Sequence, residues 1–256
     1  MGQNNPKVKL ILVGESFSPW TKKARWALEQ CGLNYNYEEY TPTLSEPQLR
    51  WRLKQWTGNV SVPVLFVEKH VLRGSWEIAC YANSVSGNRL GSMEEALEWD
   101  KLSEAALAGG RTRVVRSVLK DKVALAEALP SFIPQPFRKA LVFLARDAAT
   151  RLDKKYSHLY QQGSIKEALT ACRDALSKSS TGYITQEFSY ADITTAAVLE
   201  VIAPIAETTP TLGEATEKCW NDTALAAKFA DLVEWRNKLA KNPDTSYSQF
   251  EYYQSK

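Results

Sequence analysis

Apolar positions over the first eighty-odd residues alternate between a strand period and a helix period. We expect strands at 8–14, 34–40, 62–67 and 70–72, and helices at 19–31, 47–55 and 75–82. Ser18 occupies an N-cap position, Pro19 is the favoured first helical residue, and Gly32 is a usual helix stop. The predicted order is therefore β-α-β-α-β-β-α.

The pattern changes after a small, polar, glycine-bearing segment at 84–91, which we interpret as a linker. Strand signal is almost absent beyond it, and helical periods cover 93–129, 137–160, 164–177, 192–205 and 225–239. Gly109-Gly110 is expected to kink the first of these helices. The sequence thus predicts an α/β plus all-α fold, with a thioredoxin-like domain at 1–84 and an all-helical domain at 92–256.

Two segments of the first domain offer groups for binding a small peptide. Val62-Pro63 heads an apolar run, and a proline there indicates a sheet edge, a turn or a cis bond. The backbone N–H and C=O of Val62 are then free to bind an extended peptide. Gly74-Ser75 begins the third helix, where free N–H groups and a hydroxyl form a carboxylate site.

These residues resemble a known family. The segment from Ser18 to Leu28, Ser-Pro-Trp-Thr-Lys-Lys-Ala-Arg-Trp-Ala-Leu, is similar to the Ser-Pro-Phe-x-x-Arg-Val-Arg-x-Ala-Leu segment of serine-type cytosolic glutathione transferases. Val62-Pro63-Val64-Leu65 resembles the family's Val/Ile-Pro-x-Leu signature, and the stretch from Gly74 to Tyr81 resembles its Glu-Ser-x-x-Ile-x-x-Tyr signature. Ser189 and Asp192 resemble the capping box of the family's C-terminal domain.

The resemblance implies an activity and its site. Ser18 would be the catalytic residue that activates the thiol of glutathione, which is the co-substrate, for attack on an apolar electrophile. Val62, Pro63, Gly74 and Ser75 would bind glutathione. The resemblance also implies a homodimer.

Further residues near Ser18 complete the predicted site. Phe17 and Trp20 flank Ser18 and are candidate walls of the electrophile pocket. Ser16 is the nearest competing hydroxyl, whereas the first tyrosine of the chain is Tyr35, far from the first strand. Which electrophile reacts, and whether by conjugation, peroxide reduction or ether cleavage, stays open.

Two positions depart from the family pattern. Gly74 stands where the family usually has an acidic residue, and Ser61 stands where several serine classes have a lysine. A non-catalytic glutathione- or ligand-binding protein of the same fold is therefore the alternative interpretation. A cation for the second carboxylate of glutathione is sought among Arg50, Arg52 and Lys54, although a solvated helix face explains them equally well.

Composition limits the remaining functions. The net charge of +3 is too small to indicate nucleic-acid binding. Residues 1–91 hold eleven Lys/Arg against seven Asp/Glu, an excess that would favour a small anionic ligand, although chance surface charge explains it equally well. The four cysteines are scattered and the two histidines lie far apart, so no metal site or disulfide is expected. Residues 1–6 do not resemble a secretory signal and no apolar run is long enough to span a membrane, so we expect a cytoplasmic protein.

Overall fold

The computed structural model describes residues 9–42, 44–129, 133–205, 213–242 and 244–245. Residues 1–6 and the predicted strand position Val8 lie outside these ranges. The chain divides into two compact units, Met1–Gly91 and Ser92–Lys256.

The first unit has the thioredoxin-like order predicted from the sequence. Its elements are β1 (Leu10–Gly14), α1 (Pro19–Gln30), β2 (Asn36–Glu39), α2 (Glu46–Leu53), β3 (Val64–Val67), β4 (His70–Arg73) and α3 (Gly74–Val85). The sheet order is β2-β1-β3-β4, with β1 and β2 parallel and the other pairs antiparallel. Residues 84 and 85, expected in the linker, instead form the last turn of α3.

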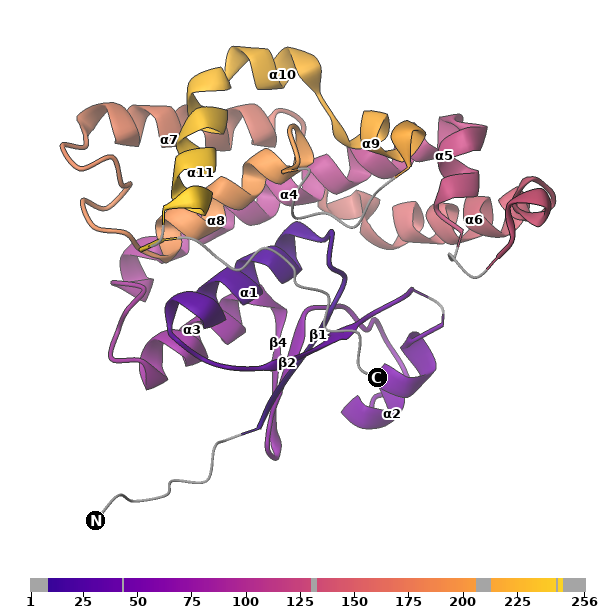
Figure 1. The fold of residues 1–256 in the computed structure, drawn as a ribbon, viewed down its shortest axis with the longest axis horizontal. Coiled ribbons are helices and arrows are strands. Elements are labelled where there is room, and N and C mark those ends of the chain that lie inside the picture. The colour runs from indigo at the N-terminus through magenta and orange to yellow at the C-terminus, as the bar shows by residue number, and fades with distance from the viewer. Residues whose placement is uncertain (1–8, 43, 130–132, 206–212, 243, 246–256) are drawn as a thin grey trace. The chain divides into compact units, whose positions relative to one another are not determined.

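Alternation along the strands distributes the apolar side chains over both faces of this sheet. Val13 packs with Leu49 of α2, and Ile11 and Phe66 lie against the same cluster. The other face is covered by α1 and α3, which pack against each other (Figure 1). Because both faces are covered, the ends of the strands are the parts of this unit left to form a site.

Within the described residues, the second unit contains helices and no strand. Its elements are α4 (Met93–Lys120), α5 (Lys122–Glu127), α6 (Gln135–Tyr156), η1 (Ser157–Leu159), α7 (Ser164–Lys178), α8 (Tyr190–Val198), η2 (Leu199–Val201), α9 (Glu214–Trp220), α10 (Thr223–Lys228) and α11 (Ala230–Lys241). Helix α4 packs against α5, α6, α7, α8 and α9, and so forms the centre of the unit.

The glycine pair of α4 has a packing role. The helix continues through Gly109 and Gly110 without a break. A Cβ on Gly110 would lie 2.4 Å from Cγ2 of Val201, and one on Gly109 would lie 2.8 Å from Oγ of Ser164. The absence of side chains therefore allows neighbouring segments to approach α4 closely.

Tertiary contacts also determine where the later helices end. The predicted helix over 225–239 is two helices, divided at the fully buried Phe229. Helix α9 was missed, and the guanidinium of Arg113 donates hydrogen bonds to carbonyls at its end, Cys219 and Trp220. The predicted capping box is present: the Ser189 N–H donates to Oδ2 of Asp192 at 2.9 Å.

Candidate functional site

Ser18 lies in the turn that joins β1 to α1. Its N–H donates to the Glu15 carbonyl at 3.0 Å, and its own carbonyl accepts from the Lys22 N–H at 3.0 Å. The hydroxyl was expected to cap α1, but within the described residues it accepts no capping hydrogen bond from the first turn. The backbone of Ser18 thus begins the helix while its Oγ stays available for another partner.

Ser16, the competing hydroxyl, is occupied by a carboxylate. Its N–H and Oγ both donate to Oε1 of Glu39, at 3.0 and 3.2 Å. Oε2 of Glu39 lies 2.9 Å from the Tyr37 hydroxyl, which donates to the Gly14 carbonyl at 2.7 Å. The two serines therefore differ in their surroundings, and Ser16 serves to fix the turn.

Glu39 and Tyr37 are functional candidates that the sequence did not reveal. They lie on β2, which reaches the turn only because β1 and β2 pair in parallel, with Gly14 opposite Glu39. Burial, and next the charge of Glu39, raise the pKa of Tyr37, so this phenol stays protonated near neutrality. The sequence signal that could have revealed Glu39 and Tyr37 is the predicted β-α-β order. Strands joined by a helix pair in parallel, and parallel strands end at the same edge of the sheet.

Strand register brings the other predicted segments to the same edge of the sheet. Val13, one residue before the end of β1, pairs with Val64, the first residue of β3, and Val64 pairs with Arg73, the last residue of β4. The turn containing Ser18, the Val62-Pro63 pair and the Gly74-Ser75 turn therefore all adjoin this edge.

A direct hydrogen bond joins two of these segments. The Val62–Pro63 peptide bond is cis, and the Pro63 carbonyl accepts from the Gly74 N–H at 2.9 Å. Gly74 has a φ of +79°, a conformation that side chains other than glycine's rarely adopt. Glycine is thus suited to this turn even though it departs from the family's acidic residue.

Ser75 is the second residue of α3, whose N-cap is Arg73. The Arg73 N–H is capped by Oε2 of Glu77 at 2.8 Å. Both serines are buried, with 3% of Ser75 and 6% of Ser18 exposed. Phe17 and Trp20 are half-buried beside Ser18.

The three candidate cations, Arg50 and Arg52 of α2 and Lys54 just after it, differ in what they contact. Arg50 binds Glu46 and two backbone carbonyls. Arg52 pairs with Glu38 and stacks over the Phe66 ring at 4.0 Å. Lys54 lines an open groove of about 370 Å³ together with Arg52, Phe66 and two tryptophans, Trp51 and Trp56. Arg52 and Lys54 therefore both line this groove, and Arg52 is already paired with Glu38.

The described residues form neither a metal site nor a disulfide. No group of three or more His, Cys, Asp or Glu side chains there is arranged to hold a metal ion. All four cysteines are free, and burial raises the pKa of Cys31, Cys172 and Cys219. No helix in the described ranges is long and apolar enough to cross a membrane.

A family model matches most of the first unit. Residues 17–85 match the family model of the glutathione S-transferase N-terminal domain. No curated protein sequence matched the chain. The match covers 69 of the 256 residues, and the likenesses described next concern the fold.

Solved structures resemble the whole chain at low sequence identity. A glutathione S-transferase from Sinorhizobium meliloti 1021 is 16% identical, with a TM-score of 0.53, over 93% of this chain and 90% of that one. A theta class enzyme from Xanthomonas axonopodis pv. citri with glutathione bound is 18% identical, with a TM-score of 0.53, over 93% and 95%. A tau class enzyme from mango is 15% identical, with a TM-score of 0.52, over 93% and 90%. At these identities the likeness establishes the fold.

Proposed function

We propose that this chain is a serine-type glutathione transferase, in which Ser18 activates the glutathione thiol for attack on an apolar electrophile. The observation that carries the proposal is the strand register, because it aligns the Ser18 turn, Val62-Pro63 and Gly74-Ser75 along one sheet edge. Three separate sequence segments thus adjoin one place, and each offers a group suited to one part of glutathione.

The binding groups divide the ligand between them. The backbone N–H and C=O of Val62 pair with the peptide part, in the manner of an added strand. The Gly74 N–H is taken by Pro63, so a carboxylate would bind the Ser75 hydroxyl and the N–H groups that follow at the start of α3. Lys54 is a candidate for the other carboxylate, since it faces the groove beside α2.

The chemistry assigned to Ser18 is stabilisation of an anion. The thiolate is the nucleophilic form of a thiol, and a free thiol has a pKa of about 8.5. A hydrogen bond from Oγ to the charged sulfur contributes roughly 1.5–3 kcal/mol, which lowers the thiol pKa by about one to two units. The start of α1 favours the same charge. The bound thiol is then largely ionised near neutral pH, and no histidine base is needed.

A non-catalytic glutathione-binding protein of the same fold is the second candidate. The observations that favour it are the missing side chain at Gly74 and the low exposure of Ser18 and Ser75. Titration calorimetry with glutathione, combined with a chlorodinitrobenzene conjugation assay, separates the candidates. Binding with turnover supports the transferase, binding without turnover supports the second candidate, and no binding refutes both.

We also propose that the protein is a cytoplasmic homodimer. Phe137, Phe143 and Leu144 of α6 are exposed by 61%, 63% and 48%, an apolar surface that soluble proteins tend to cover with a partner. The four free cysteines fit a reducing compartment. Light scattering after size exclusion tests the dimer: a mass near 28.8 kDa, that of one chain, would refute it.

A further inference from the structure

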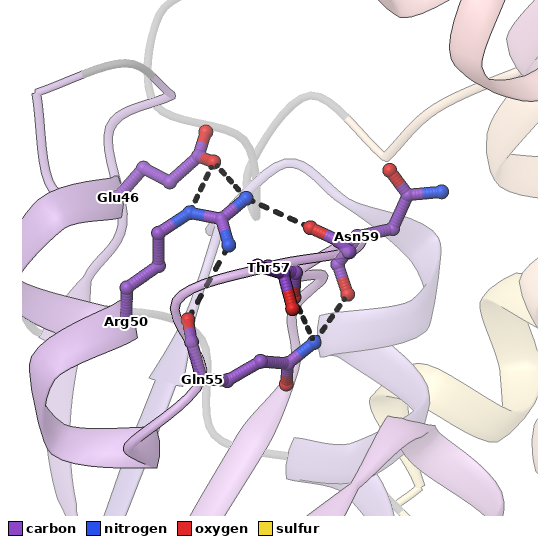
Figure 2. A network of polar contacts seen from close by, with 6 residues as sticks. Glu46, Arg50, Gln55, Thr57 and Asn59 are labelled. Atoms are coloured by element: carbon purple, nitrogen blue, oxygen red, sulfur yellow. Dashed lines mark hydrogen bonds and ion pairs between the residues drawn. The ribbon is translucent and has the colours of Figure 1, made fainter.

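Arg50 binds the loop that follows its own helix. Its Nε donates to Oε1 of Glu46 at 2.9 Å, and this ion pair turns the guanidinium toward the loop. The remaining nitrogens donate to the carbonyl of Gln55 at 3.3 Å and of Gly58 at 2.9 Å (Figure 2). The guanidinium is thus used to hold backbone, which a merely solvated side chain would not do.

Gln55, the first residue of this loop, binds the loop backbone through its own side chain. Its Nε2 donates to the carbonyls of Thr57 and Asn59, at 3.3 and 3.1 Å (Figure 2). Its Oε1 accepts a hydrogen bond from the guanidinium of Arg73, at the end of β4. We call Glu46, Arg50 and Gln55, with the carbonyls they bind over 55–59, the loop network.

The loop network is linked to both of the segments proposed to bind glutathione. Asn59 is followed by Val60, which is buried against α2 and β1, and two residues later by Val62. Arg73, bound to Gln55, immediately precedes Gly74 and Ser75. One set of hydrogen bonds therefore joins the backbone carbonyls before Val62 to the side chain of Arg73, the residue before Gly74.

We propose that Arg50 and Gln55 are positioning residues that hold these two segments in the geometry glutathione requires. The inference rests on the proposed function. Loop residues 55–59 form neither helix nor strand, so side-chain hydrogen bonds take the place of a backbone ladder in fixing them. A loop released from the network populates other conformations, and the apparent affinity for glutathione falls by the fraction that stays competent.

The test combines kinetics with hydrogen exchange. Arg50→Ala should raise KM for glutathione about threefold to tenfold, with kcat within about twofold. The reason is that glutathione binding is weakened equally in the ground state and in the transition state. Amide exchange at residues 56–62 should accelerate in the same variant. Gln55→Glu keeps the acceptor for Arg73 and loses both donors, so exchange should accelerate at 56–60 and keep the wild-type rate at 73–77.

The matched control is Arg151→Ala on α6, which removes another i,i+4 ion pair, to Asp147, far along the chain from the loop. It should change neither KM nor exchange at 56–62. Arg50→Lys, which keeps the charge and loses the planar fork, should also raise KM, and it replaces Arg50→Ala if that variant does not fold. An equal KM in the Arg50 and Arg151 variants would overturn the positioning role and leave the proposed function standing. Wild-type protein that binds no glutathione would overturn the proposed function, and the positioning role with it.

Discussion

Replacing Ser18 by alanine isolates the step on which the proposed mechanism depends. Because the hydroxyl makes no capping hydrogen bond in α1, the variant should not lose the roughly 1 kcal/mol that removal of a helix cap usually costs. What it loses is the hydrogen bond to the charged sulfur, about 1.5–3 kcal/mol. At 1.36 kcal/mol for each tenfold change, conjugation at neutral pH should fall about tenfold to a hundredfold.

The assay is a pH–rate profile with chlorodinitrobenzene, from about pH 5.5 to 9.5, for wild type and Ser18→Ala. The defect should shrink as the pH rises, because solvent base then ionises the bound thiol without help. Glutathione affinity and the melting temperature should change little, since the backbone of Val62 and the hydroxyl of Ser75 provide most of the binding in the proposed site.

Ser16→Ala is the control, because its Oγ is bound to Glu39 and not free for a ligand. Its profile should keep the wild-type pH dependence. Superimposable profiles of wild type and Ser18→Ala would refute the mechanism. A shifted profile in Ser16→Ala alone would transfer the role to Ser16.

Three further predictions concern binding and stability. Ser75→Ala should raise KM for glutathione more than it lowers kcat; an equal fall in kcat with KM unchanged would place Ser75 in the chemistry. Gly110→Ala should lower the free energy of unfolding by about 1–2 kcal/mol in urea titrations, because the clash with Val201 exceeds the gain in helix propensity, and a more stable variant would contradict this packing. Burial raises the pKa of Asp192 to about 6, above its unfolded value of about 3.9, so its contribution to stability is present below about pH 4 and declines as the pH rises through about 6. Asp192→Asn should remove this decline in unfolding titrations at several pH values, and an unchanged pH dependence would assign it to another group.

Local sequence signals determined the elements that depend on neighbouring residues. Pro19 and Gly32 bound α1 as expected, and the Ser189–Asp192 capping box begins α8, because each of these devices acts within a few residues. The alternating order of the first domain follows from the same short-range periodicity. Four short motifs, in order along the chain, also resemble the family whose N-terminal domain model matches residues 17–85.

Only the tertiary structure decided what each side chain contacts. Nothing near Ser16 in sequence indicates that Glu39 would bind it, since the contact depends on parallel pairing across twenty-three residues. The sequence was equally consistent with a solvated Arg50, whereas in the structure its guanidinium donates to carbonyls of the loop at 55–59. The pair Gly109-Gly110 suggested a kink, and nothing near it in the sequence indicated that Val201, far along the chain, packs against Gly110. Contacts between distant segments form only when the chain is folded, so local patterns cannot specify them.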